Sequence, residues 1–362
     1  MNKQEKIKNF DPSQPGLADE SIFGLPFTAD ESEIIIIPVP WEVTVSYGAG
    51  ASDGPEAILE ASFQVDLHHQ EFPDLWKLGM YLDLTEQTEK WAKDSIKYKG
   101  LAQPIIAALE SGEVIESMPA LQSDLDKINL VCKELKNEVR ERALFWIKKG
   151  KKVVLLGGDH STPLGYYEAL ATLYDNFGIL HLDAHMDLRI AYEGFQYSHA
   201  SIMYNALQIP QITKIVQVGI RDFCKQEVET VFSEGNRVIV HTDMDLKAAT
   251  FQGTDWEKQC QQIIVTLPEN VVISFDIDAL YSWYCPNTGT PVPGGISFEQ
   301  ATYLLSKLAD SGKKIIGFDL VEVAPGNDDW DGNVGARMLY HMCGVLAKNN
   351  GMNVGKKINF PK

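Results

Sequence analysis

The stretch HLDAHMDLRI, residues 181–190, places Asp183, His185 and Asp187 at every second position. It directly follows the apolar run FGIL, which is typical of a strand. Alternate side chains of a chain that leaves a strand point the same way, so these three are expected to share one face. Grouping ionisable side chains is expensive unless a positive charge neutralises them. The spacing therefore predicts that a cation binds here.

Similar donors follow three other apolar runs. VVLL is followed by GGDHS, which contains His160, and VVISF leads into Asp276 and Asp278. The run IIGFDLVEV carries Glu322 at its end. Because the carboxyl ends of parallel strands form one edge of a sheet, where ligands bind, we expect these distant residues to converge on a single site.

The donor set indicates which metal and how many ions. It comprises two imidazoles and four carboxylates: His160, Asp183, His185, Asp187, Asp276 and Asp278. Structural zinc prefers four ligands and often thiolates, whereas carboxylate-rich sites with some imidazole suit Mn²⁺, with Ni²⁺, Co²⁺ and Fe²⁺ as alternatives. Bridging carboxylates allow six side chains to hold two ions about 3.5–4 Å apart. We therefore predict two divalent metal ions per chain, with Mn²⁺ as the favoured ion.

Each segment also has a plainer interpretation when it is taken alone. GGDHS is also compatible with a turn and helix cap, and DID with a cap for the next element. Ion pairing explains DAHMD less well, because only Arg189 is a nearby base. The occurrence of all three segments at strand ends favours the metal site.

The elements that position these residues alternate between strands and helices. Strands are predicted at 34–37, 153–156, 179–182, 215–218, 238–240, 271–275 and 315–320. They are apolar almost throughout, as expected for parallel strands that are buried on both faces. Helices are predicted at 163–174, capped by Ser161-Thr162, and at 298–309, capped by Ser297. This alternation predicts an α/β fold.

Residues 84–150 depart from this alternation. They are rich in Lys, Glu, Gln and Asp, and apolar residues recur at helical spacing between Leu121 and Lys149. This spacing predicts a long amphipathic helix that packs on the flank of the sheet, with partner binding as the alternative. There is no repeat or low-complexity linker, so we predict one domain over residues 1–362 with a helical insertion at about 84–150.

The composition excludes several classes of protein. The chain has 362 residues, of which 44% are hydrophobic, and 50 acidic against 32 basic residues give a net charge of -18. Because an acidic surface repels phosphates, nucleic acid is not an expected partner. The five cysteines are scattered without a C-x-x-C pair, which argues against a disulfide framework or zinc ribbon.

No membrane segment is expected either. The first residues, MNKQEKIKNFDPSQPG, are polar and lack an apolar stretch of signal-peptide length. A run of about 18 apolar residues, as a bilayer span needs, is also absent from the sequence. These observations predict a cytoplasmic protein.

The motifs GGDHS, DAHMD and SFDID, together with TGTPVPGG, resemble the signature segments of the ureohydrolase family, which comprises arginases, agmatinases and their relatives. The resemblance implies a three-layer α/β/α fold around a parallel sheet of about eight strands. It also implies a two-manganese centre, hydrolysis of a small guanidino substrate to an amine and urea, and a homo-oligomer, either a trimer or a hexamer. By position, His160 and His185 resemble terminal ligands of the two metals, and Asp183 and Asp276 resemble bridges. Asp187 and Asp278 would complete the two coordination shells.

The same resemblance implies three catalytic residues. Asp187 corresponds to the carboxylate that transfers a proton from the nucleophile to the leaving nitrogen. His199, in YSHAS, corresponds to a proton-shuttling histidine, with an ordinary loop histidine as the alternative. Glu322 corresponds to the carboxylate that binds the guanidinium, with a buried ion-pair partner as the alternative.

Departures from the family pattern narrow the range of possible substrates. Arg189 and Cys224 stand where arginases carry an asparagine and an acid that bind the amino-acid head group. This favours agmatine, hydrolysed to putrescine as in polyamine biosynthesis, over arginine. Guanidinobutyrate, guanidinopropionate, guanidine and arginine remain as alternatives, and a non-catalytic regulatory subunit is the alternative of a different class. Tyr281, Trp283 and Tyr284 replace the usual continuation of FDID and either reshape the pocket mouth or pack within their own loop.

Overall fold

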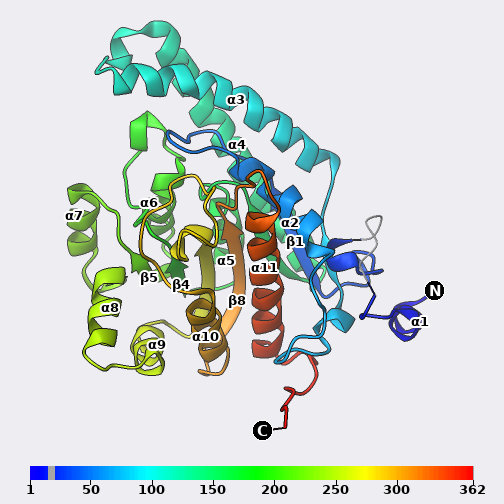
Figure 1. Ribbon diagram of the computed structural model, residues 1–362. Coiled ribbons are helices and arrows are strands. Elements are labelled where there is room, and N and C mark those ends of the chain that lie inside the picture. Colours follow the sequence, from blue (N-terminus) through cyan, green and yellow to red (C-terminus); the bar gives the residue numbers. More distant parts are fainter. Residues whose placement is uncertain (15–20, 362) are drawn as a thin grey trace.

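The protein folds around one sheet of eight parallel strands (Figure 1). The computed structural model describes residues 1–14 and 21–361. The spatial order of the strands is β2-β1-β3-β8-β7-β4-β5-β6. Their bounds are β1 Ile34–Val39, β2 Met80–Leu82, β3 Lys152–Gly157, β4 Phe177–Leu182, β5 Ile212–Ile220, β6 Val238–Thr242, β7 Asn270–Asp276 and β8 Lys314–Val321. The predicted α/β class is confirmed, and all seven predicted strands are present.

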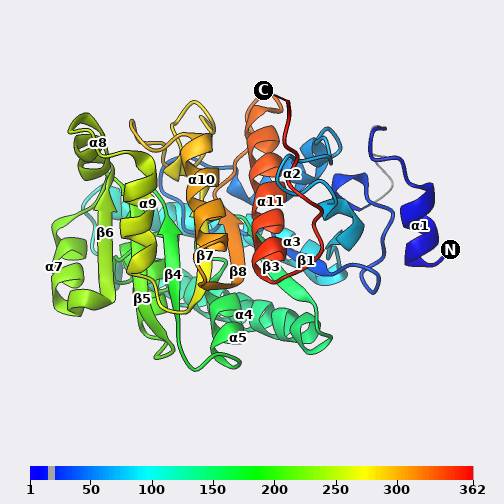
Figure 2. The same ribbon diagram turned by 90° about the horizontal axis from the view of Figure 1, so that it is seen from below.

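Helices cover both faces of this sheet, which confirms the three-layer arrangement (Figure 2). One face packs against α2 (Gly54–Ser62), α8 (Asp243–Phe251), α9 (Trp256–Val265), α10 (Phe298–Ala309) and α11 (Trp330–Asn349). The other packs against α3 (Glu86–Glu110), α4 (Pro119–Lys148), α5 (Leu164–Ala171), α6 (Ile202–Leu207) and α7 (Lys225–Glu234). The short helix α1 (Lys3–Asn9) lies at the edge near β2 (Figure 1).

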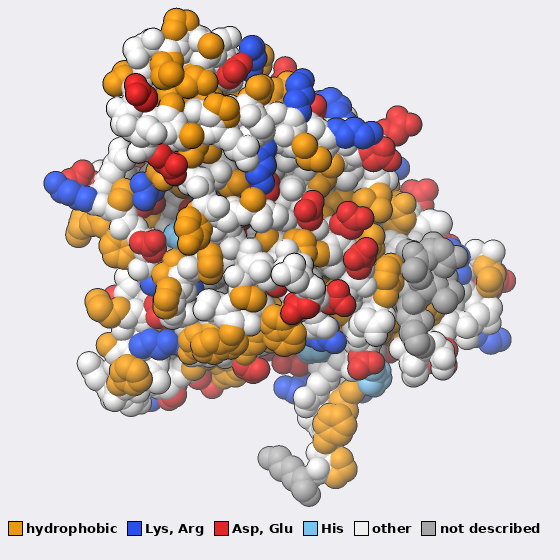
Figure 3. Space-filling view, turned by 45° about the horizontal axis from the view of Figure 1, so that its top comes forward, with side chains coloured by type: hydrophobic (Ala, Val, Ile, Leu, Met, Phe, Trp, Pro, Cys, Tyr) orange, Lys and Arg blue, Asp and Glu red, His pale blue; other side chains and the backbone are white. Residues whose placement is uncertain are grey.

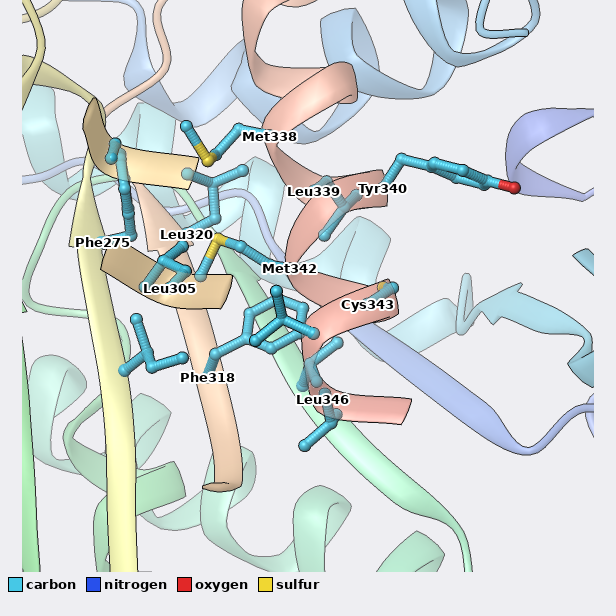
Figure 4. Packing of buried hydrophobic residues seen from close by; sticks show 14 of the residues in the cluster. Phe275, Leu305, Phe318, Leu320, Met338, Leu339, Tyr340, Met342, Cys343 and Leu346 are labelled. Carbon is cyan, nitrogen blue, oxygen red and sulfur yellow. The ribbon is translucent and has the colours of Figure 1, made fainter. Parts of the chain in front are cut away.

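Large apolar side chains fix the central strands to their helices. Phe275 of β7 and Phe318 of β8 are fully buried and pack with Leu305 of α10 and with Met338 and Met342 of α11 (Figure 4). Burial of such a side chain stabilises the fold by about 1.5–3 kcal/mol. The ends of β7 and β8, where candidate site residues lie, are therefore held on a rigid base.

The two predicted helix starts differ in outcome. α10 begins at Phe298, and the Ser297 hydroxyl accepts the Gln300 amide hydrogen at 3.1 Å, so that cap is confirmed. α5 spans only Leu164–Ala171, and the predicted Ser161-Thr162 cap is wrong. The Ser161 hydroxyl donates to the Asp159 carboxylate and the Thr162 hydroxyl to the Asp159 carbonyl. Both side chains turn toward Asp159 and stabilise the turn after β3, and neither oxygen caps α5, whose N-cap position is Pro163.

Residues 84–150 fold into two antiparallel helices, α3 and α4 (Figure 1). The helix predicted at 121–149 is α4, within two residues at each end. Trp91 of α3 donates from Nε1 to Glu138 of α4 at 2.7 Å, which joins the two helices. Buried α4 side chains, Ile128 and Val139 among them, pack in the core cluster on this face of the sheet, as the flank-packing interpretation expects.

The sequence also led us to expect no disulfide framework and no membrane segment. All five cysteines are free, so no disulfide framework is present. Among the residues that the structure describes, no helix combines the length and the apolar character that crossing a bilayer requires.

Candidate metal centre and active site

Strand order and register bring the predicted site residues to one place. β3, β8, β7 and β4 are consecutive neighbours at the centre of the sheet. Leu182 pairs with Phe275, and Phe275 pairs with Leu320, so the strands end level with one another. Asp183 and Asp276 therefore emerge side by side from adjacent strands. The turn after β3 adds His160, and Gly158 in that turn is needed because a Cβ there would lie 2.1 Å from the Trp41 carbonyl oxygen.

The His160 imidazole faces three carboxylates. Its Nδ1 lies 3.1 Å from an oxygen of Asp183 and 3.2 Å from one oxygen each of Asp187 and Asp276. This nitrogen is buried and makes no hydrogen bond of good geometry with any described residue. One imidazole nitrogen among three carboxylate oxygens is the arrangement expected of a position for a cation.

A second group forms around His185. Its Nδ1 lies 3.4 Å from Asp183 Oδ1 and 3.1 Å from Asp278 Oδ2. Asp183 thus turns Oδ1 toward His185 and Oδ2 toward His160, as expected of a carboxylate between two ions. The other predicted bridge, Asp276, directs Oδ2 to His160, while its Oδ1 accepts the Asp278 amide hydrogen at 2.9 Å.

The electrostatics of the cluster call for positive charge. Burial raises the pKa of Asp187 to about 6, and the charge of Asp183 adds to the shift. Burial, and then the charges of Asp278 and Asp183, raise the pKa of Asp276 well above its usual value. Burial lowers the pKa of His185, but the carboxylates of Asp278 and Asp183 outweigh it and bring that pKa to about 12. Two divalent cations would relieve this excess of negative charge.

A hydrogen-bonded chain behind His160 prepares it to be a ligand. The Ser274 hydroxyl donates to Asp319 at 2.8 Å, so its oxygen accepts from His160 Nε2 at 2.9 Å. Tyr167 also donates to Asp319, at 2.8 Å. A proton on Nε2 leaves the Nδ1 lone pair directed at the carboxylates, which is the tautomer that a metal requires. The residues present therefore fit a metal.

His181 supports the cluster in a similar way. Its Nε2 lies 2.7 Å from Asp183 Oδ2, and its Nδ1 lies 2.9 Å from Gln217 Nε2. The sequence reasoning missed His181, Ser274 and Asp319 as functional residues. Each is a polar residue inside an apolar strand, and a buried polar residue needs a partner, so this signal would have found them.

Glu322 follows β8 in a left-handed backbone conformation, with φ of 63°. Its Oε1 accepts the His160 amide hydrogen at 2.8 Å. This hydrogen bond fixes the Glu322 carboxylate beside the candidate metal ligands. Asp187 is also left-handed, with φ of 54°. Such backbone strain in residues other than glycine gathers at functional sites.

His199 lies close to the same cluster, on a turn that follows β4. Its Nδ1 is 3.4 Å from the Thr44 hydroxyl. Burial lowers the pKa of His199 to about 4, and the neighbouring His185 and His160 add to the shift. The imidazole is therefore neutral at pH 7.

A cavity of about 390 Å³ opens at this edge of the sheet. The predicted catalytic residues Asp187, His199 and Glu322 line it, together with His185 and Asp276. Its other walls are Ser46, Tyr47, Arg189, Tyr192, Ala200, Asp222, Phe223, Glu227, Thr290, Pro291 and Val292. In the view that brings this edge forward, Lys and Arg side chains are scattered among acidic ones (Figure 3).

The aromatic segment after FDID does not shape this cavity, so the first of its two predicted roles is wrong. Residues 290–292 of the same loop line the cavity instead. Tyr281 and Trp283 stack with ring centroids 4.3 Å apart, and Lys247 donates to the Tyr281 hydroxyl at 2.9 Å. These contacts hold Tyr281 against Trp283 and α8, while Trp283 stays 62% exposed.

Comparison with known proteins is consistent with this geometry. The chain is 29% identical to an N(1)-aminopropylagmatine ureohydrolase of Thermus thermophilus over 87% of this chain and 91% of that protein. It is also 29% identical to the agmatinase of Neisseria meningitidis serogroup C over 82% and 81% of the two chains. The agmatine ureohydrolase of Thermoplasma volcanium shares the fold, with a TM-score of 0.68, 21% identity and 96% and 99% coverage.

The model of the Arginase family matches residues 32–344, which include every candidate site residue. Members of this family are ureohydrolases that depend on a binuclear metal centre, commonly of Mn²⁺. The convergence of the six predicted donors and the ureohydrolase relatives argue against the alternative of a non-catalytic subunit. The chain belongs to the arginase family and is a ureohydrolase that acts on guanidino substrates.

Proposed function

We propose that the preferred substrate is agmatine, which the enzyme hydrolyses to putrescine and urea. The negative charge of the cavity is the main support for this proposal. Asp222, Glu227 and Glu322 line it in addition to the predicted metal ligands, and Arg189 is the only lysine or arginine among its described lining residues. An acidic cavity favours a substrate that is positively charged at both ends.

The position of Arg189 argues against guanidino acids. Its guanidinium carbon lies 4.6 Å from the centre of the Tyr192 ring, and its Nε lies 3.9 Å from Glu227 Oε2. An arginine that is already close to a carboxylate attracts a second one less strongly. Cys224 is the N-cap residue of α7 and is not among the described residues that line the cavity. Its thiol also provides no carboxylate that would bind the α-ammonium group of arginine.

We propose that the six predicted ligands hold the two metal ions, in the roles predicted for them. Mn²⁺ is the ion proposed, with Ni²⁺, Co²⁺ and Fe²⁺ as alternatives. When bound, such ions lower the pKa of water to near 7 and so supply the strong nucleophile that a resonance-stabilised guanidinium carbon requires.

Three residues act on the substrate in this proposal. Asp187 takes the proton of the attacking water and gives it to the leaving nitrogen. Neutral His199 moves protons between the leaving amine and solvent. Glu322 uses Oε1 for the His160 amide, which leaves Oε2 to accept a hydrogen bond from the guanidinium.

Urea release from a panel of guanidino compounds tests the substrate. We expect kcat/KM for agmatine to exceed that for L-arginine by roughly 10³-fold, because Arg189 already lies beside Glu227 and an α-carboxylate would meet an acidic cavity. The panel also contains guanidinobutyrate, guanidinopropionate and guanidine, and it is run after loading with Mn²⁺ and with Ni²⁺. A preference for arginine would refute the head-group argument, and a preference for a guanidino acid would refute the argument from charge.

N(1)-aminopropylagmatine is the second candidate substrate. Several relatives of this chain carry that name. Tyr47 is 85% exposed at the cavity rim, so the rim is open to solvent at this point. An open rim on an acidic cavity is compatible with a longer polyamine tail. The same panel includes this compound, and a higher kcat/KM for it than for agmatine would make it the preferred substrate.

We also propose that the enzyme forms a trimer or a hexamer. Large α/β enzymes commonly form symmetric homo-oligomers. Light scattering at micromolar concentration is expected to give a mass three or six times that of the 40.4 kDa chain. A monomer mass under these conditions would contradict the proposal.

A further inference from the structure

The α3–α4 hairpin, residues 86–148, contacts both loops that border the cavity. The first rim loop, residues 42–51, contributes Ser46 and Tyr47 to the cavity wall. The second rim loop, residues 191–198, contributes Tyr192 and leads into His199. The hairpin extends beyond the carboxyl edge of the sheet, above these loops (Figure 1).

Glu42 closes the first rim loop. Its side chain is fully buried, and its carboxylate accepts the Gly50 amide hydrogen at 2.8 Å and the Ala51 amide hydrogen at 3.4 Å. A side chain at one end of the loop is thereby bound to the backbone of the other end. Gly50 has φ of 133°, a conformation that favours glycine, so the turn that presents these amides is specified by its residue type.

The hairpin holds Glu42 through two residues of α3. Lys99 Nζ lies 2.7 Å from Glu42 Oε2. The Ser95 hydroxyl accepts the Glu42 amide hydrogen at 2.8 Å and donates to the Glu42 carbonyl at 3.2 Å. Asp159 and Glu322 are buried carboxylates whose pKa values are raised by burial and further by the charge of Glu42. The ammonium of Lys99 therefore offsets a negative charge that lies next to the active site.

Asn129 of α4 holds the second rim loop. Its Nδ2 donates to the Gly194 carbonyl at 3.1 Å, and its Oδ1 accepts the Gln196 amide hydrogen at 2.8 Å. This loop contains two residues other than glycine with positive φ, Ala191 at 45° and Glu193 at 55°. A strained loop keeps one conformation only when its surroundings enforce it, and Asn129 binds it at two points.

We propose that the α3–α4 hairpin sets the shape of the cavity mouth, and that Lys99 and Asn129 are positioning residues for substrate binding. The candidate metal ligands lie at the strand ends or within five residues of them and outside both rim loops, so loosening these loops leaves the ligands in place. The parts of the cavity wall that Tyr47 and Tyr192 contribute then shift, and Thr44 moves relative to His199. The effect on catalysis rests on the proposed function, whereas the effect on the loops does not.

The test compares Lys99→Met with Lys99→Arg, which keeps the charge, and with Lys97→Met, an exposed lysine of the same helix. We expect Lys99→Met to raise KM for agmatine about tenfold, with kcat within about threefold, because the rim positions the substrate. Metal content per chain is expected to stay unchanged. Lys99→Arg is expected to restore KM to within about threefold of the parent value, and Lys97→Met to leave it unaltered.

Hydrogen exchange provides a readout that needs no substrate. In Lys99→Met, peptides that cover residues 42–51 are expected to exchange at least about tenfold faster, while peptides of β4 and β7 keep their protection. Asn129→Ala gives the corresponding test at residues 191–198 and replaces Lys99→Met if that variant does not fold. Unchanged exchange in both loops, or an unchanged KM for agmatine despite faster exchange, overturns the inference. If no guanidino compound is hydrolysed by the parent enzyme, the proposed function fails, and the exchange data alone decide whether the hairpin holds the loops.

Discussion

Asp183→Ala is expected to abolish ureohydrolase activity and to reduce bound metal from about two ions per chain to one or none. Asp183 is the carboxylate whose two oxygens face His160 and His185 separately, at 3.1 and 3.4 Å. Its removal takes a ligand from both predicted ions and leaves His181 without its carboxylate partner. Changes behind a metal ligand already cost about 10–100-fold in affinity, so the loss of a shared ligand is expected to exceed 100-fold.

The comparison with a terminal ligand makes this prediction specific. His160→Ala is expected to lose less metal than Asp183→Ala, because it removes one ligand of one ion. Asp175→Ala, at the opposite end of β4 and exposed, is the matched control and is expected to retain metal and activity. Elemental analysis of Mn²⁺-reconstituted protein measures the ions, and urea release measures activity. Equal and minor losses in Asp183→Ala and His160→Ala would contradict the bridging role.

Glu322→Gln is expected to lower kcat/KM for agmatine by about 100- to 1,000-fold while metal content stays the same. The amide oxygen of glutamine can still accept the His160 amide hydrogen that Glu322 Oε1 accepts at 2.8 Å, so the turn after β3 is preserved. The charge that binds the guanidinium is lost. Removing one partner of a buried, charged hydrogen bond costs about 2–5 kcal/mol, and 100- to 1,000-fold, about 2.7–4.1 kcal/mol, lies within these limits.

Two further measurements connect that loss of activity to the guanidinium contact. Glu269→Gln, an exposed residue before β7, is the control and is expected to behave as the parent enzyme. Elemental analysis must again find about two ions per chain in Glu322→Gln. If the variant loses its metal, or if kcat/KM falls by less than tenfold, Glu322 is not the residue that binds the guanidinium.

The candidate ligands were predictable because the sequence displays both donors and strands. Asp183 and Asp276 each follow a continuous apolar run, and parallel strands deliver their carboxyl ends to one edge. The structure indeed brings all six predicted ligands together, along with Glu322 and His199. Residue type and position relative to a strand end are local properties, and a single sequence contains them.

Three features were missed or wrongly predicted from the sequence, because their local sequence signals are weak or have a competing interpretation. Strand β2 spans only Met80–Leu82 at the edge of the sheet, too short for a periodic pattern to be recognised. Ser161 and Thr162 look like a helix cap, but the oxygens of Asp159 lie within reach and take their hydrogen bonds. Tyr281 and Trp283 follow the DID motif closely in sequence, but they stack on each other, which no one-dimensional pattern indicates.

The sequence by itself determined the chemistry of this protein: the types of donor, their place after buried strands, the α/β class and the family. Only the tertiary structure decided which strands are neighbours, because the order β3-β8-β7-β4 joins segments that lie far apart along the chain. It also decided the contacts that position the site residues and the rim. Ser274 and Asp319 form a hydrogen-bonded chain behind His160, and Lys99 pairs with Glu42. Such contacts depend on packing between distant segments, and the free energy that selects them comes from burying the whole core rather than from any local pattern.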